Sequence, residues 1–279
     1  MQLSILSIAV ALCAARLSLS QRTCDSNISD DEVLLAELEF KGQPAATAQA
    51  FPLVTINVHF HVIAANTSIQ GGWLADGDIQ RQVNELTRDF SIANLAFNRV
   101  NTTRTINPDW FHNVKAASQQ QHDMKMALRA GGVTDLNIYS VGFTGTTKLG
   151  YASYPLSYRS LPWDDGIVIL YSSLPGGTRK PFNLGKTAVH ETGHWVGLYH
   201  TFQTACTGRG DHVDDTPAEA SPAWGCPHGR DSCVGEGFEG IDPIYNFMDY
   251  SDDGCMDSFT QGQVVKMRES LAFYRGIPV

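Results

Sequence analysis

The residues with the clearest chemical potential lie in the segment HETGHWVGLYH, from His190 to His200. On a helix, His190 and His194 share one face, so both imidazoles can reach one cation. Glu191 can hold a water molecule and accept its proton without ligating the metal. Gly197 lets the helix end, so that His200 can turn back as a third ligand. Three protein ligands and one open position are typical of catalytic zinc, whereas structural zinc has four ligands.

Ordinary histidines on an amphipathic helix are the alternative for a bare H-E-x-x-H. The added glycine and third histidine favour the metal site. A second pair, His59 and His61, falls on one face of a predicted strand. We interpret this pair as structural, because no third ligand lies near it in the sequence.

The extended motif and the later segment Asn246-Phe247-Met248-Asp249-Tyr250 together resemble the metzincin metallopeptidases. The segments HETGHWVGLYHTF, DDTPAEASPAWGCP and NFMDYSDDGCM resemble the pappalysin family in particular, and the resemblance covers roughly residues 53–279. Thr201 follows the third histidine, where adamalysins, astacins and matrixins typically have Asp, Glu or Ser.

The resemblance implies a secreted endopeptidase that hydrolyses extracellular proteins through a zinc-bound water activated by Glu191. Met248 would lie beneath the zinc, and Tyr250 would stabilise the oxyanion of the tetrahedral intermediate. Protein or peptide substrates would bind in extended form along an edge strand at residues 150–155. A zinc hydrolase of a non-peptide bond and an inactive secreted binding module are the alternatives. The second should lack a ligand or the base, and all four residues are present.

An acidic loop follows the motif and contains Asp211, Asp214, Asp215 and Thr216. Closely spaced oxygen ligands fit calcium, and a solvated acidic loop explains the spacing equally well. The resemblance favours a structural calcium ion.

Two further carboxylates, Asp252 and Asp253, follow the methionine turn. In metzincins the chain after this turn walls the S1′ pocket. We therefore expect Asp253 to pair there with Arg or Lys of the substrate. The alternative is that both aspartates cap the loop or hold calcium.

Cysteine usage points to an oxidising compartment. Cys206, Cys226, Cys233 and Cys255 lie within about fifty residues and lack the C-x₂-C pairs of structural zinc, so they indicate two disulfides. Spacing alone permits three pairings; the resemblance implies Cys206–Cys233 and Cys226–Cys255. Cys24 is left over. We expect it to cap the zinc in a latent precursor, as a propeptide cysteine does in several metzincins; a dispensable free thiol is the alternative.

The chain has 279 residues, 43% of them hydrophobic, and a formal net charge of −9. Its length suffices for a core, and its acidity argues against nucleic-acid binding. Residues 1–20 have the layout of a secretory signal peptide, and no later segment is long and apolar enough to anchor the chain in a membrane. We expect a secreted protein with candidate N-glycosylation at Asn27, Asn66 and Asn101. The oligomeric state stays open.

The elements that must position these residues follow from periodicity. Strands are predicted at residues 53–63, 124–128, 136–141 and 167–171, and helices at residues 30–40, 78–97, 183–197 and from a capping box at Thr260 and Gln263 onward. In the first helix, Val33, Leu34 and Leu38 share a face.

This order predicts an α+β fold. We expect a signal peptide (1–20), a propeptide-like segment (21–50) whose end (41–50) resembles a linker, and a catalytic domain (51–279). The family implies an upper subdomain of about 51–200, with a twisted mixed sheet and long helices above the zinc cleft. It also implies an irregular, disulfide-linked lower subdomain of about 201–279, with the methionine turn and a C-terminal helix.

Overall fold

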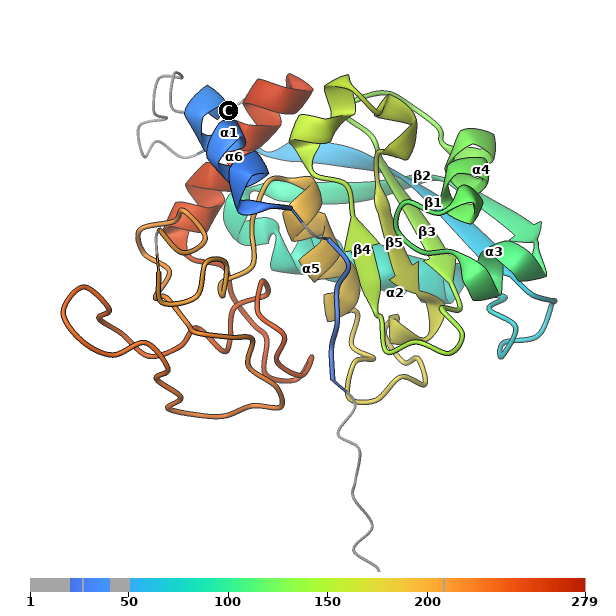
Figure 1. The fold of residues 1–279 in the computed structure, drawn as a ribbon. Coiled ribbons are helices and arrows are strands. Elements are labelled where there is room, and N and C mark those ends of the chain that lie inside the picture. Colours follow the sequence, from blue (N-terminus) through green and yellow to red (C-terminus); the bar gives the residue numbers. More distant parts are fainter. Residues whose placement is uncertain (1–20, 27, 41–50, 208, 279) are drawn as a thin grey trace, which may run out of the picture.

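The computed structural model describes residues 21–26, 28–40, 51–207 and 209–278 (Figure 1). The strands are β1 (Val54–Ala64), β2 (Leu95–Ile106), β3 (Leu136–Val141), β4 (Gly150–Ala152) and β5 (Ile167–Leu170). The α-helices are α1 (Asp30–Phe40), α2 (Asp76–Asp89), α3 (Pro108–Asn113), α4 (Gln119–Leu128), α5 (Lys186–Trp195) and α6 (Gln261–Arg275). Short 3-10 helices span Ser91–Ala93, Pro155–Arg159, Pro162–Asp164 and Tyr171–Ser173. The fold is α+β, as predicted.

The five strands form one sheet in the order β2-β1-β3-β5-β4. All neighbouring pairs are parallel except β4 and β5, so the short strand β4 is an antiparallel edge. This edge lies beside α5, the helix that carries the histidine motif (Figure 1). The predicted edge strand near residue 150 is therefore present, although it is only three residues long.

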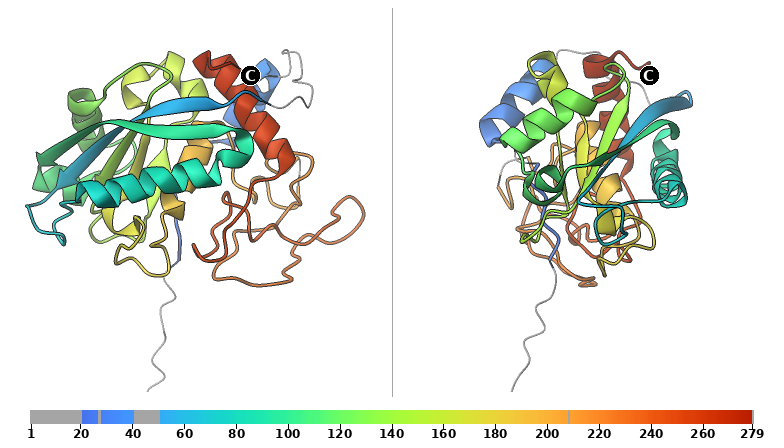
Figure 2. Two further views of the ribbon diagram at one scale, coloured as in Figure 1. Left: turned by 180° about the vertical axis from the view of Figure 1, so that it is seen from behind. Right: turned by 90° about the vertical axis from the view of Figure 1, so that its right-hand side faces the viewer.

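Both faces of the sheet are covered, as the apolar run of β5 predicts. Ile167 and Ile169 face a cluster that contains residues of α2 and α5, whereas Val168 and Leu170 face a second cluster with residues of α3 and α4. Figure 2 shows α2 and α4 on opposite sides of the sheet. The motif helix is thus held against a rigid layer.

Two predicted elements are wrong. The helix expected to reach Phe97 ends at Asp89, and Phe97 belongs to β2. Asn94 turns the chain in a left-handed conformation (φ 50°) without a glycine to mark the break. Phe97 still packs on Phe90, with ring centroids 5.4 Å apart, which explains why its position matched the helical period.

The strand expected at residues 124–128 is the last part of α4. The helix begins earlier than that window, at the cap residue Ser118, whose side chain accepts a hydrogen bond from the Gln121 amide. The alternating apolar residues of so short a window could not distinguish a helix from a strand.

Helix α1 lies where it was predicted, but it packs through a different face. Val33, Ala36 and Glu37 are buried, whereas Leu34 and Leu38 are 53% and 59% exposed. On this face Glu37 forms an ion pair with Lys266 of α6 (2.8 Å), and Val33 packs in a cluster with Tyr154 and Tyr199.

Among the described residues between α5 and α6, the chain forms no helix or strand. Disulfides Cys206–Cys233 and Cys226–Cys255 cross-link this part, with Cα–Cα distances of 5.5 and 5.6 Å, in the pairing that the resemblance implies. No helix within the described ranges is both long and apolar enough to cross a membrane. The predicted signal peptide, the linker 41–50 and Asn27 lie outside the described residues; Asn66 and Asn101 are exposed.

Candidate metal centre

Three imidazoles converge at the end of α5. The Nε2 atoms of His190, His194 and His200 lie 3.1–3.2 Å from one another, and all three rings are buried. His190 and His194 come from consecutive turns of the helix. Gly197 has a φ of 104°, a conformation that other residues rarely adopt, and this turn brings His200 back to the other two.

The donor set fits a bound metal ion. Nδ1 of His190 donates to the Phe247 carbonyl and Nδ1 of His194 to the Leu198 carbonyl, each at 2.8 Å, so the facing Nε2 atoms of these two rings present lone pairs. Burial lowers the pKa of all three histidines, to about 4 for His194, which keeps the rings neutral. Nitrogens about 2.0–2.1 Å from a tetrahedral zinc ion stand roughly 3.3 Å apart. The spacing of the three Nε2 atoms therefore fits a cation bound between the rings.

The floor of the centre comes from the later part of the chain. Met248 is fully buried beneath α5, and its sulfur occupies the space that a side chain at position 193 would need, so Gly193 is required there. The rings of His190 and His200 lie 5.6 and 5.1 Å from that of Tyr250. Met248 and Tyr250 therefore lie close to the centre, where the resemblance places them.

Glu191 points toward the N-terminal segment rather than toward solvent. Its Oε2 atom accepts hydrogen bonds from Cys24 Sγ at 3.2 Å and from Ser26 Oγ at 3.0 Å. Burial raises the pKa of Glu191 to about 7, and the two hydrogen bonds oppose this rise. The carboxyl group is thus poised between its charged and neutral forms.

Cys24 lies beside the three histidines. Its sulfur and one nitrogen of each of the three histidines lie within 4.8 Å of one another, and this is the one such group among the described residues. Burial and the Glu191 carboxylate raise the pKa of the thiol well above its usual value. A thiolate at this position would therefore need a cation beside it.

The segment around Cys24 lies along β4 like an added strand. Thr23 O accepts from the Leu149 amide at 3.0 Å, and the Asp25 amide donates to Gly150 O at 3.1 Å. Cys24 and Gly150 form a parallel bridge. The segment therefore occupies the free edge of the sheet.

Arg22 and Asp253 form an ion pair in which both side chains are almost fully buried. The Arg22 guanidinium also lies over the ring of Phe182, 5.1 Å from its centroid. The other oxygen of Asp253 accepts from the Leu184 amide at 2.7 Å, in the loop before α5. Asp253 thus holds a basic side chain of this chain and also anchors the loop before α5.

A peptidase family model described as Pregnancy-associated plasma protein-A matches residues 136–272. An extracellular metalloprotease of Verticillium alfalfae is 43% identical over 246 residues, which cover 87% of this chain and 84% of that protein. One of Pyricularia oryzae is 45% identical over 241 residues, covering 86% and 82%. The chain belongs to the pappalysin family of metallopeptidases.

Solved structures agree with this pappalysin assignment. A promirolysin mutant of Tannerella forsythia superposes with a TM-score of 0.70 at 26% identity, covering 86% of each chain. Mature mirolysin of the same organism, in complex with a cleaved peptide, gives 0.63 at 28% identity and covers 77% of this chain and 90% of that one.

The acidic loop of this pappalysin does not gather its carboxylates. Asp214 is exposed, and Asp215 accepts from Thr260 Oγ1 (2.6 Å) and the Gly262 amide (2.9 Å) at the start of α6. Asp211 is buried beside Lys266, whose ammonium donates to its backbone carbonyl at 3.1 Å. Burial raises the pKa of Asp211 to about 7, and the Lys266 ammonium opposes this rise most strongly, ahead of hydrogen bonds from the Val213 amide and the Thr216 side chain.

Sequence reasoning missed three residues near the centre. Arg22 and Ser26 flank Cys24 at alternate positions, and this spacing was the signal that could have found them, because alternate residues of a strand share a face. Tyr154 carried no motif; its hydroxyl lies 3.1 Å from His194 Nδ1. The pair His59 and His61 is not a metal site: His61 is buried between Thr103 and Asn137, which hydrogen bond to its two ring nitrogens.

Proposed function

We propose that this chain is a secreted zinc endopeptidase in which Glu191 is the general base. The observation that carries the proposal is the cluster of three imidazole Nε2 atoms beside the Glu191 carboxyl group, at a sheet edge that accepts an extended peptide. The names of the relatives, extracellular metalloproteases, support both the activity and secretion.

Each protein group has a distinct part in the reaction. Bound by the three histidines, zinc would polarise the scissile carbonyl and make a water more acidic. Glu191 takes the proton of the attacking water and passes it to the leaving amine, a role that suits a carboxyl pKa near neutrality. The Tyr250 hydroxyl, which now bonds to the backbone of Cys24, is placed to donate to the oxyanion.

Glu191→Ala tests the function. We expect the variant to keep one zinc ion per chain by elemental analysis but to lose at least about a thousandfold in kcat/KM on casein-derived peptides. Glu236→Ala, an exposed acid in the lower part, is the matched control. A zinc-loaded Glu191→Ala protein that kept more than about a tenth of wild-type kcat/KM would contradict the proposal. Hydrolysis of esters without hydrolysis of peptides would favour the non-peptide alternative.

We further propose that residues 22–26 hold the enzyme latent. Cys24 would take the fourth ligand position, and Ser26 occupies the general base directly. Cys24→Ser and Ser26→Ala should each raise the activity of the uncleaved precursor on a short peptide. Thr23→Ala, whose side chain is directed toward Thr147 rather than the histidines, is the control. Precursors as latent as wild type would refute this role.

We propose that Asp253 selects Arg or Lys at P1′, the position after the scissile bond. Its ion pair with Arg22 supports this, because the propeptide fills the pocket with the side chain that a substrate would offer. Asp253→Asn keeps an acceptor for the Leu184 amide and removes the charge. We expect it to lose roughly tenfold or more of the preference for Arg, while Asp252→Asn keeps the preference. An aliphatic P1′ preference in the wild type would exclude this role.

We also propose a structural calcium ion. Of the four candidate ligands in the acidic loop, Asp211 and Thr216 remain. Asp214 and Asp215 have separate partners, and the Lys266 ammonium opposes a cation close to Asp211. Calcium should raise the Tm of the wild type and not of Asp211→Asn. An equal Tm with calcium and with chelator would exclude the site.

A further inference from the structure

A hollow of about 520 Å³ opens beside the carboxyl end of β4. Volumes of about 300–1,000 Å³ are typical of ligand sites. Its walls come from the loop before α4, from α4 itself, from β4 and from the 3-10 helix Pro162–Asp164; they include Ala116, His122, Tyr151, Leu161, Trp163 and Asp164. Residues 152–154, at and after the end of β4, line it as well, so it is continuous with the peptide-binding edge.

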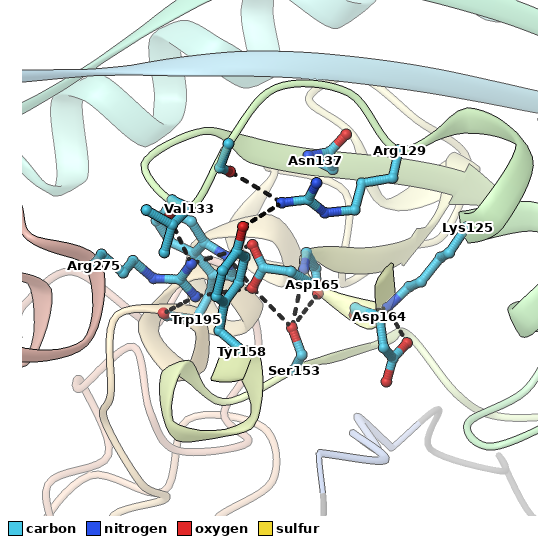
Figure 3. Close-up of polar contacts among 12 residues, drawn as sticks. Lys125, Arg129, Val133, Asn137, Ser153, Tyr158, Asp164, Asp165, Trp195 and Arg275 are labelled. Carbon is cyan, nitrogen blue, oxygen red and sulfur yellow. Dashed lines mark hydrogen bonds and ion pairs between the residues drawn. The ribbon is translucent and has the colours of Figure 1, made fainter. Parts of the chain in front are cut away.

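The charged groups at its base neutralise each other. The Lys125 ammonium donates to Asp164 Oδ1 at 2.8 Å and to the Asp164 carbonyl at 2.6 Å (Figure 3). Lys125 is almost fully buried, so its charge is committed to this pair. The hollow therefore favours neither an acidic nor a basic occupant.

The wall beside Asp164 is held rigidly. The next residue, Asp165, points the opposite way and receives both Arg275 Nη atoms at 3.0 and 3.1 Å and Trp195 Nε1 at 3.1 Å (Figure 3). These contacts tie the start of β5 to α5 and α6. A wall fixed in this way loses little conformational freedom when a ligand binds.

Apolar side chains line the mouth. Leu161 is 44% exposed, and the Trp163 ring packs edge-on against His122, with centroids 4.8 Å apart. Such a wall suits an aromatic side chain, because aromatic rings favour edge-to-face and offset contacts.

The N-terminal segment bound along β4 indicates which substrate residue the hollow would bind. Arg22, Cys24 and Ser26 face the centre, and Asp25, between them, forms an ion pair with Lys148 on the outer side and lines the mouth of the hollow. The hollow and the Asp253 pocket lie on opposite sides of Cys24. If the Asp253 pocket takes P1′, as proposed above, the hollow takes a residue before the scissile bond.

Side chains on one face of a strand recur every second residue, about 6.6 Å apart. If P1′ takes the place of Arg22, then P1 faces outward at the place of Thr23. P2 faces the centre at the place of Cys24, and P3 faces outward at the place of Asp25. Asp25 lines the hollow, and the lining continues to Tyr154 and Ser157.

We propose that this hollow is the S3 subsite and that it binds an aromatic side chain three residues before the scissile bond. The proposal rests on the proposed endopeptidase function. It adds to that function a second element of specificity, on the opposite side of the metal centre from Asp253.

The test uses the active, zinc-loaded enzyme and a series of quenched fluorescent peptides with Arg at P1′ and Ala at P1 and P2. P3 is Phe, Ala, Lys or Glu. We expect kcat/KM for Phe to exceed that for Ala by about fivefold to tenfold, with Lys and Glu close to Ala. Ala116→Trp fills the hollow from an exposed position and should bring the Phe:Ala ratio to about one.

Ile106→Trp, at an exposed position on β2 at the opposite edge of the sheet, is the matched control and should keep the wild-type ratio. Leu161→Ala should give an intermediate ratio. A flat or charge-dependent P3 profile overturns the proposal, as does an aromatic preference that survives Ala116→Trp. In both cases the peptides are still cleaved, so the proposed function stands. No hydrolysis of any peptide in the series would contradict that function and this inference with it.

Discussion

The halves above and below the metal centre are stabilised by different interactions. Above it, at residues 54–195, two large apolar clusters cover both faces of the sheet. Below it, at residues 201–259, four side chains join the larger of these clusters: Phe247, Met248, Met256 and Phe259. The apolar cluster that belongs wholly to this half has three members among the described residues: Ala223, Ile244 and Cys255. The rest of the lower half is held by two disulfides and by buried polar contacts.

The polar contacts of the lower half centre on Arg230, which pairs with Glu219 and Asp242. Burial, together with the neighbouring Asp249 carboxylate, raises the pKa of Glu219, which also accepts from the Thr201 hydroxyl beside His200. His190 and His194 lie in α5, whereas His200 directly precedes the lower half, where Thr201 bonds to Glu219. The geometry of the centre therefore depends on both halves. Activity should therefore be lost before the sheet unfolds whenever the lower half is weakened.

The largest change in stability should follow truncation in the upper core. Phe60, in β1, is fully buried, and Phe60→Ala should cost about 3–5 kcal/mol of unfolding free energy through the lost contacts and the cavity. Urea unfolding followed by far-UV circular dichroism measures this. Ile106→Ala, at an exposed position in the neighbouring strand, should cost less than about 0.5 kcal/mol. Similar losses in the two variants would mean that the apolar layer is not what stabilises this half.

Removal of a disulfide should act on the lower half. The Cys226–Cys255 bridge closes a loop with a sequence separation of 29 residues, for which chain entropy predicts about 3.5 kcal/mol. In Cys226→Ser/Cys255→Ser, hydrogen exchange should accelerate at residues 201–259 while the amides of β1 stay protected, and peptidase activity should fall. Uniform loss of protection across the chain would show that the two halves unfold as one unit.

Acid should weaken the upper half through His61. Burial lowers the pKa of His61 to about 4, so the folded protein keeps the ring neutral while the unfolded chain binds a proton below about pH 6.5. Stability is therefore lost as the pH falls from about 6.5 to 4, by up to about 3 kcal/mol. The free energy of unfolding of His61→Gln should depend less on pH over this range. An unchanged slope of unfolding free energy against pH would assign the acid sensitivity to other groups.

Glu219 of the lower half acts in the opposite sense, because its raised pKa favours the folded state as the pH falls.

The smallest effect is expected where the halves join, at the start of α6. Thr260 caps this helix by accepting from the Gln263 amide at 3.1 Å. Thr260→Ala should cost about 1 kcal/mol, and Thr260→Ser, which keeps the hydroxyl, only a few tenths. Thermal unfolding of the three proteins measures the difference. Equal destabilisation by Ser and Ala would attribute the effect to packing of the methyl group rather than to the cap.

The parts of the molecule that the sequence predicted are those encoded locally. The histidine helix follows from residue spacing and the α6 cap from the Thr260–Gln263 pair, since each signal spans a few residues. Strand β2 was missed because a left-handed Asn94, which no local pattern marks, separates it from α2. In the acidic loop, carboxylates that are neighbours in the sequence do not point to a common site, because Asp214 and Asp215 contact different partners.

Contacts between distant segments could not be predicted in this way. The Arg22–Asp253 pair joins residues separated by 231 positions, and no periodicity links them. Only the family resemblance pointed toward Asp253, and nothing in the sequence identified its partner. Burial of Glu37 in α1 depends in the same way on Lys266, a residue of the last helix.

The parallel course of residues 23–25 along β4 has a consequence for how inhibition would end. A peptide that runs from the hollow to the Asp253 pocket, as proposed above, would lie in the opposite direction, so the N-terminal segment would be a poor substrate for this site. A cut in the segment 41–50 would leave residues 22–40 attached by contacts alone, and an intramolecular inhibitor would become a separate ligand with a finite dissociation constant. We therefore expect activity to appear on dilution rather than at the moment of cleavage. A concentrated secretion would remain inhibited near its source and become proteolytic as it is diluted.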